Sequence, residues 1–205
     1  MSSTRCHTFT GQGFDPFNPR PEDVRIADIA HHLAMICRFG GATPVFYSVA
    51  QHSVLVARLV LEISGDPLWA LYGLHHDNGE SAMGDIRRPL KHFILIQGSA
   101  MKQCAFTHDL SFESWEMMVH DVCTHGLGIP ALGDEEEEAW KLIEAADDAM
   151  LHAEMHGMFG EVIERQSMIL ARSVRPENAW DWETAKRNFW NLHEELMGKV
   201  REVRG

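Results

Sequence analysis

The chain lacks the features that mark membrane-spanning and secreted proteins. No run of apolar residues approaches 18, and the first six residues contain no apolar signal core, so we expect neither a membrane span nor a secretory signal. The cysteines lie far apart and form no C-x-x-C pair. This wide spacing fits reduced cytosolic thiols better than a disulfide framework or a thiolate zinc site. We therefore predict a cytoplasmic protein with four free cysteines: Cys6, Cys37, Cys104 and Cys123.

Basic residues are also scarce. The sequence has 18 Lys and Arg against 30 Asp and Glu, a formal net charge of −12, which argues against stable binding to nucleic acids. Part of this charge is the acidic run 134–138, which we interpret as a helix start favoured by the helix dipole. A phosphate ligand would therefore have to be held locally, by a cation and a few basic side chains.

Linkers and strand patterns are missing as well. No Gly/Ser/Pro-rich or low-complexity tract interrupts the 205 residues, so one domain is the better interpretation. Its motif-bearing core runs to about residue 155 of a domain spanning 21–205, after an irregular arm over 1–20 that is rich in Gly, Pro, Asp and Asn. Only 42–47 is a short strand candidate. The fold class predicted is all-α, a bundle of roughly seven or more helices.

Capping residues and apolar spacing place these helices along the chain. Gly40-Gly41 is expected to end the first helix, and Gly65 the second. The last helix carries apolar residues on one face, which favours core packing, with a homo-oligomer interface as the alternative. The predicted helices begin at Pro21, at Ser48, at Pro67, near residue 99 and at Asp134 (this last to about His156), with two more near 160–172 and 181–199.

The segment 75–85 places two histidines and three carboxylates directly after an apolar helix. Imidazole and carboxylate are suitable ligands for a divalent cation. His52 lies on the apolar stripe of its own helix, and Asp147 shares a helix face with Ile143 and Met150, where an unpaired carboxylate would be costly. We expect a mixed nitrogen and oxygen metal site with positions left open for water or substrate. Its ligands would be His52, His76, Asp77 and Asp147.

These residues, in this order, resemble the HD-domain metal-dependent phosphohydrolases. The wider pattern resembles the branch that contains the bacterial 5′-deoxynucleotidases and the phage dATP triphosphohydrolases. The resemblance covers about residues 9–155, and it rests on the segments Ile36–Gly41, Tyr47–Ser53, His76–Glu80, Gly84–Lys91 and Ala146-Asp147 with Glu154. It implies an HD-domain fold, a divalent metal cofactor (Mn, Co, Zn, Mg or Fe), a nucleotide substrate, and a location in the cytosol of a bacterium or of a phage-infected host.

Carried over to this sequence, the resemblance implies a role for each remaining site residue. Glu80 matches the carboxylate that orients or deprotonates the attacking water, and Asp85 matches a second carboxylate near water or the sugar 3′-hydroxyl. Arg38 and Phe39 match the pair that lines the nucleotide pocket. Lys91 matches a phosphate-contacting lysine. Without the resemblance, Arg38 would be a cation at a helix C-terminus and Lys91 a solvated loop residue.

The sequence departs from this family at four places. His75 precedes the doublet, where it either competes as a ligand or caps the helix, and Asn78-Gly79 replaces a helix-favouring pair. Arg87 stands where the family often has proline, so Arg87-Arg88 adds positive charge near the phosphate, and we count Arg88 among the substrate-binding residues. Phe39 replaces a tryptophan of some members, which bears on the selection of 2′-deoxy sugars.

We therefore expect an enzyme that hydrolyses phosphate esters of deoxynucleotides and releases phosphate or triphosphate, with purine dNTPs and dATP in particular favoured. A 5′-deoxynucleotidase specific for dNMPs is the alternative within this branch. Two other classes stay open: a di-iron oxygenase, for which His75 is the only obvious spare ligand, and a nucleotide sensor without catalytic activity.

Overall fold

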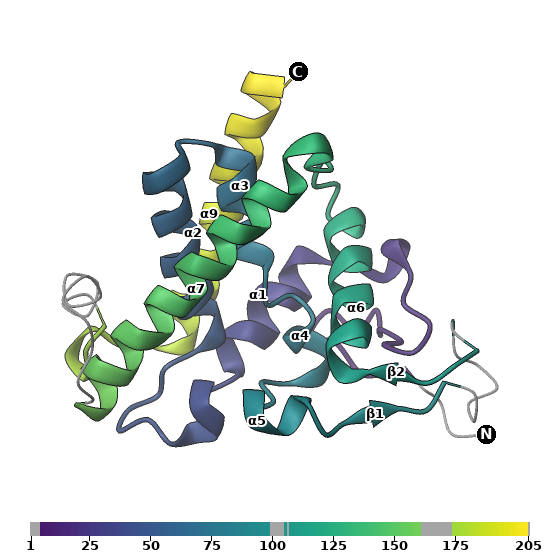
Figure 1. Ribbon diagram of the computed structural model, residues 1–205, viewed down its shortest axis with the longest axis horizontal. Helices are drawn as coiled ribbons and strands as arrows, with labels where there is room; N and C mark the ends of the chain where they lie inside the picture. Colours follow the sequence, from purple (N-terminus) through teal and green to yellow (C-terminus); the bar gives the residue numbers. More distant parts are fainter. Residues whose placement is uncertain (1–4, 99–104, 106, 161–173, 205) are drawn as a thin grey trace.

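The computed structural model describes residues 5–98, 105, 107–160 and 174–204, and these residues are predominantly helical (Figure 1). The all-α fold class is confirmed. The α-helices are α1 (Ile26–Met35), α2 (Val49–Ser64), α3 (Pro67–His75), α4 (Glu80–Met83), α5 (Arg88–Lys91), α6 (Phe112–Gly126), α7 (Glu136–Phe159) and α9 (Trp182–Arg204). Short 3-10 helices are η1 (Pro21–Asp23), η2 (Arg38–Gly41), η3 (Gly133–Glu135) and η4 (Pro176–Asn178), and the two strands are β1 (Leu95–Ile96) and β2 (Leu110–Ser111).

The ends of α2 and α3 follow from local sequence chemistry. The Ser48 hydroxyl accepts a hydrogen bond from the backbone N–H of Gln51, as expected of an N-cap. Gly65 ends α2 in the left-handed region with φ of 69°. Asp66 then caps α3 by accepting from two backbone N–H groups, and Pro67 occupies the first turn. These two helices begin and end where the sequence predicts.

The core lies where α2 meets its neighbours. α2 contacts α1, α3, α7 and α9, and α9 in turn contacts α1 and α3 (Figure 1). Phe189 and Leu196 of α9 are fully buried, which confirms core packing for that helix. Because α2 and α7 also carry predicted ligands, their packing decides whether those ligands meet.

The segment from 99 to 125 differs from the prediction of one continuous helix. Residues 110–111 form β2, which pairs antiparallel with β1, and α6 begins only at Phe112. The Ser111 hydroxyl accepts from Ser114 N–H, and this cap fixes the start of α6. The sheet was missed because two residues per strand leave no alternating pattern. Residues 99–104 and 106 lie outside the described part.

Three further predictions differ from the structure: the extent of the first helix, the strand candidate, and the start of the acidic helix. Pro21 opens only a 3-10 turn, and α1 starts at Ile26 and ends at Met35, before Gly40-Gly41. Segment 42–47 is irregular, and its neighbourhood holds only an isolated bridge between Cys37 and Ser48. The acidic run lies partly in η3, so α7 begins at Glu136 and extends to Phe159.

The N-terminal arm and the chain after α7 complete the description. Residues 5–20 are irregular, as expected, apart from a bridge between Cys6 and Phe14. The helix predicted near 160–172 lies almost entirely outside the described residues. Among the helices that are described, none combines the length and the apolar character needed to cross a membrane.

Candidate metal centre and adjoining cavity

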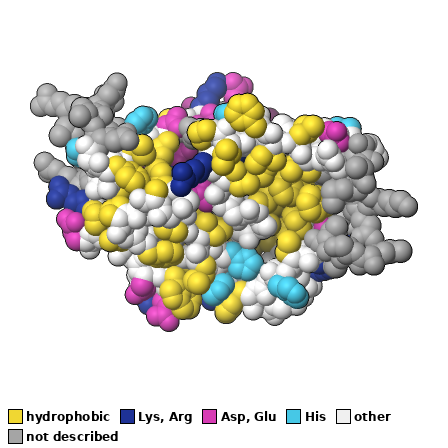
Figure 2. All heavy atoms as spheres, turned by 90° about the horizontal axis from the view of Figure 1, so that it is seen from below, with side chains coloured by type: hydrophobic (Ala, Val, Ile, Leu, Met, Phe, Trp, Pro, Cys, Tyr) yellow, Lys and Arg dark blue, Asp and Glu magenta, His cyan; other side chains and the backbone are white. Residues whose placement is uncertain are grey.

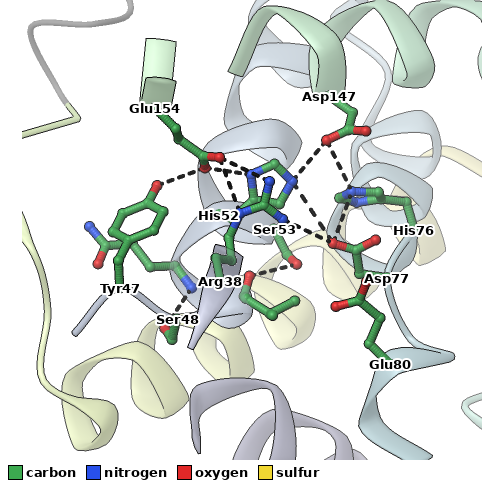
Figure 3. Close-up of polar contacts among 12 residues, drawn as sticks. Arg38, Tyr47, Ser48, His52, Ser53, His76, Asp77, Glu80, Asp147 and Glu154 are labelled. Carbon is green, nitrogen blue, oxygen red and sulfur yellow. Dashed lines mark hydrogen bonds and ion pairs between the residues drawn. The ribbon is translucent and has the colours of Figure 1, made fainter. Parts of the chain in front are cut away.

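Three predicted ligands from separate parts of the chain meet at one point. His52 comes from α2, His76 follows the end of α3, and Asp147 comes from α7 (Figure 3). One ligand atom from each residue lies within 4.8 Å of the others. The Oδ1 atom of Asp147 is 3.0 Å from His52 Nε2 and 3.8 Å from His76 Nε2. This group can hold a metal ion.

The two imidazoles fit a cation because their facing nitrogens have no hydrogen bond. Within the described structure, His52 Nε2 and His76 Nε2 are both buried without a hydrogen-bond partner. The 3.0 Å contact of His52 with Asp147 is within ion-pair distance but lacks hydrogen-bond geometry. A buried polar atom left unpaired is costly, and coordination to a cation would remove that cost.

Asp77 lies beside the same point. Its Oδ2 atom is 3.3 Å from His76 Nε2 and 3.9 Å from His52 Nε2 (Figure 3). Arg38 is also near, with Nη1 3.7 Å from the same oxygen. Asp77 thus lies beside the group of His52, His76 and Asp147 and is paired with Arg38, and its role as a fourth ligand stays a prediction.

Glu154 orients His52 through the ring nitrogen that does not face Asp147. Its side chain is fully buried on α7, and its Oε1 atom accepts a hydrogen bond from His52 Nδ1 at 2.7 Å. Tyr47 donates to the same oxygen at 3.0 Å, and the Arg38 guanidinium donates to Oε2 at 2.9 and 3.1 Å (Figure 3). With its proton on Nδ1, His52 presents the Nε2 lone pair to the cluster. His76 is oriented in the same way, because its Nδ1 donates to the Gly73 carbonyl at 2.8 Å.

The charges around the cluster shift its pKa values in opposite directions. Burial lowers the pKa of His76, but the Asp77 and Asp147 carboxylates outweigh it and raise this pKa to about 9. The pKa of His52 is raised as well, because Glu154 and Asp147 outweigh burial and the Arg38 charge. The pKa of Asp147 is lowered despite burial, since two imidazoles face it. Without metal, the surrounding carboxylates therefore favour the protonated form of both imidazoles.

Glu80 begins α4 and faces the same region (Figure 3). It is 4% exposed, and its Oε2 atom has no hydrogen-bond partner among the described residues. Burial, followed by the charges of Asp77 and Asp85, raises its pKa well above the usual glutamate value. A carboxyl group whose pKa is moved toward neutrality is suited to exchange protons with a reacting group.

Lys91 faces Glu80 but has a second partner that sequence reasoning missed. Its Nζ atom is 3.5 Å from Glu80 Oε1, and it donates to both oxygens of Glu116, at 2.8 and 3.0 Å. Glu116 lies on α6, within the segment that the sequence analysis predicted only as a helix beginning near residue 99. No local sequence signal marks Glu116, because only the packing of α6 against the α5 region brings it to Lys91.

A cavity of about 560 Å³ adjoins the candidate metal site. Two of its walls differ in character: charged residues stand near the cluster, and apolar side chains of α7 and η2 line the other side. Figure 2 shows Lys or Arg and acidic side chains together near the centre of one face of the molecule, with hydrophobic side chains on both sides. The lining residues are Arg38, Phe39, Ala42, Asp77, Glu80, Asp85, Ile86, Arg87, Pro89, Lys91, Asp147, Leu151, Met155 and Phe159.

Phe39, which lines this cavity, has an unusual backbone conformation. Its φ of 57° and ψ of 24° lie in the left-handed region, which a bulky residue rarely adopts. The ring packs edge-on against Phe159, with 5.3 Å between centroids, and Arg38 lies over its face at 5.4 Å. Such strain persists where surrounding contacts hold it, often at binding sites. Phe159 was not foreseen, since it lies beyond the recognised motifs.

Two predicted residues need separate mention. Asp85 lines the cavity and is near enough to Glu80 to raise its pKa. The Arg88 side chain lies outside the described part of the structure, so its predicted role is not placed.

His75 points away from the cluster. It is fully buried, its Nδ1 lies 2.8 Å from Asn78 Oδ1, and its Nε2 lies 2.9 Å from His193 Nδ1. Burial, followed by the neighbouring His193, lowers its pKa well below the usual value. With both ring nitrogens engaged in this network, His75 is a core residue and not a spare ligand.

Comparison with known proteins gives relatives without an assigned function. No family model matches the chain. The chain is 40% identical over 86 residues to an uncharacterized protein of Rhodobacter capsulatus, covering 40% of this chain and 44% of that protein. It is 41% identical over 87 residues to the uncharacterized protein YfdR of Escherichia coli, covering 42% and 46%. The matched stretch thus spans less than half the length of each relative.

Proposed function

We propose that this protein is a metal-dependent phosphohydrolase of the HD type that acts on deoxynucleotides. The observation that carries the proposal is that the buried Glu80 lines one cavity together with Asp147 of the cluster able to bind a cation and with basic and apolar side chains. A water-activating carboxylate, a cation and nearby positive charges are the requirements for hydrolysis of a phosphate ester.

His52, His76 and Asp147 would hold the cation, with Asp77 as a fourth ligand. The donors are two imidazole nitrogens and carboxylate oxygens, a set that suits Mn, Co, Zn or Fe, and Mg less well. When bound, the cation would polarise a phosphoryl oxygen and lower the pKa of a coordinated water.

Glu80 would take a proton from the attacking water. Its raised pKa follows from burial and from the Asp77 and Asp85 charges, and a raised pKa makes the carboxylate a better proton acceptor. Lys91, 3.5 Å from Glu80, keeps the base correctly placed and can meet a phosphate oxygen. Asp85 lines the same cavity, where it would assist the water or bind the sugar 3′-hydroxyl.

Arg38 and Phe39 would bind the rest of the nucleotide. Arg38 is held rigidly by the fully buried Glu154 and lies near the metal ligand Asp77, so a phosphate there would find a fixed guanidinium. Phe39 offers an aromatic edge and face to a base or sugar, opposite Phe159. Purine dNTPs, dATP in particular, are the substrates we favour, and a dNMP-specific nucleotidase is the alternative.

The test is a panel of dNMPs, NMPs, dNTPs and NTPs with Mn, Co, Mg or Zn, analysed for phosphate, pyrophosphate and triphosphate. We expect release of phosphate from dNMPs or of triphosphate from dNTPs. The proposal fails if no nucleotide is hydrolysed with any metal. Binding of nucleotide without turnover would instead favour the sensor.

A further inference from the structure

Among the residues that the structure describes, three cationic side chains line the cavity, and two of them already have carboxylate partners. Arg38 is paired with the fully buried Glu154 at 2.9 Å, and Lys91 is paired with Glu116 at 2.8 Å. In the part of the chain that the structure describes, neither an ion pair nor a side-chain hydrogen bond joins Arg87 to any residue. Its guanidinium is therefore the lining cation most available to a ligand.

The glycine turn of η2 makes room for Arg87. Gly40 has φ of +58°, and a Cβ atom placed there would lie 2.8 Å from Arg87 Nη2 and 2.9 Å from Nε. The guanidinium thus lies directly against the backbone of the turn that also carries Arg38 and Phe39. Gly41, with φ of +79°, has open space where its Cβ would be.

The charged side chains of the cavity leave Arg87 as the cation available to an anion. Four carboxylates (Asp77, Glu80, Asp85, Asp147) stand against three cationic side chains among the lining residues. A divalent cation at the cluster would balance two of these carboxylates, and the charges of Arg38 and Lys91 are already balanced by Glu154 and Glu116. Among the described lining residues, Arg87 is therefore the cation whose charge is left to attract an added anion.

We propose that Arg87 is a specificity-determining residue that binds the distal phosphates of a nucleoside polyphosphate. This inference rests on the proposed function and deepens it. The reacting phosphate must lie by the cluster and Glu80, where Arg38 and Lys91 are the neighbouring cations. Arg87 lines the same cavity from the η2 side, where its guanidinium lies against Gly40, and among the described residues no hydrogen bond or ion pair joins it to the cluster. A chain of phosphates that extends away from the reacting atom would therefore reach it.

The kinetic test compares two substrates that differ only in their phosphates. dATP and dAMP are assayed with wild-type protein, Arg87→Ala and Arg87→Lys, with the exposed α2 residue Arg58→Ala as the matched control. A charge-assisted contact to phosphate predicts that Arg87→Ala lowers kcat/KM for dATP by about tenfold more than for dAMP. Arg87→Lys is expected to recover part of the loss, and Arg58→Ala to leave the ratio as in the wild type.

A second pair of variants tests the position of the guanidinium without removing it. Gly40→Asn and Gly41→Asn place the same side chain at two positive-φ positions that asparagine tolerates better than other residues. Gly40→Asn displaces Arg87, whereas Gly41→Asn points into open space. Only Gly40→Asn is expected to shift the dATP to dAMP ratio in the direction of Arg87→Ala.

Binding of inorganic tripolyphosphate separates this inference from the proposed function. We expect calorimetry on the metal-loaded protein to show tripolyphosphate bound more tightly than orthophosphate, and Arg87→Ala to reduce that preference by about tenfold. Equal effects on dATP and dAMP, or an unchanged preference in Arg87→Ala, overturn the role of Arg87 and leave the hydrolase proposal standing. If wild type hydrolyses no nucleotide, the proposed function fails, and the tripolyphosphate result alone decides the role of Arg87.

Discussion

His52 Nδ1 lies 2.7 Å from Glu154 Oε1, and neither side chain is exposed to solvent. This hydrogen bond fixes which nitrogen of His52 faces Asp147. The same carboxylate accepts from Tyr47 and from Arg38, so one buried anion holds a ligand and a cavity-lining cation together. The pKa of Glu154 is lowered because these partners outweigh burial, which keeps it ionised at neutral pH.

Glu154→Gln is expected to weaken metal binding by about 10- to 100-fold, since an amide no longer favours the Nδ1–H tautomer as strongly. Isothermal titration with Mn or Co measures the affinity, and nitrogen NMR shifts of His52 report the tautomer. Glu144→Gln, at an exposed position of the same helix, is the matched control. An unchanged affinity in Glu154→Gln, with a mixed tautomer, would contradict the positioning role.

The adjacent histidines 75 and 76 are expected to behave in opposite ways. His76→Ala removes a ligand atom and should abolish stoichiometric metal binding. His75→Ala should keep the metal but lower the free energy of unfolding by about 1–3 kcal/mol, because Asn78 and His193 lose a buried partner. Metal content by mass spectrometry and denaturant unfolding give the two readouts. Loss of metal in both variants at equal stability would assign His75 to the site.

Glu80→Gln is expected to lower kcat by about 100-fold or more while nucleotide and metal still bind, as for removal of a general base. Glu116→Gln is the comparison, since Glu116 also contacts Lys91 but has no contact with the cluster. Glu116→Gln should change mainly KM, because loss of the ion pair leaves Lys91 able to contact the phosphate. If Glu80→Gln turns over as the wild type does, the catalytic assignment is wrong.

Metal binding should release protons at neutral pH. The pKa of His76 in the metal-free protein is raised to about 9, and that of His52 is also raised, so a cation must displace protons to reach both nitrogens. Metal affinity should therefore increase with pH up to about 9. Titrations at pH 7 in buffers of different ionisation enthalpy count the protons released, and a count of zero would refute the charged apo site.

The same shift has a consequence for the stability of the metal-free protein. Because the folded pKa of His76 exceeds the unfolded value near 6.5, its stabilising contribution is full below about pH 6.5 and is lost as the pH rises through about 9. Unfolding of the chelated protein across this range should show falling stability, and saturating metal should reverse the trend.

Several features of the candidate site were inferred from local sequence chemistry. Asp147 was predicted from helical spacing to share a helix face with Ile143 and Met150, and both of those residues are buried. The doublet at residues 76 and 77 was identified because imidazole and carboxylate side chains directly after an apolar helix indicate a cation site. The order and type of the long helices followed from caps and apolar stripes, whereas β1 and β2 were too short to leave a pattern.

The sequence by itself determined the helical class, the capping of α2 and α3, and the residues able to bind a cation. Only the tertiary structure decided which atoms meet, because α2, the end of α3, and α7 bring His52, His76 and Asp147 together across nearly a hundred residues. It also decided that His75 belongs to the core, that Glu116 pairs with Lys91, and that Arg87 lies on the Gly40 turn. Such contacts depend on how helices pack against one another, and spacing along one helix does not encode them.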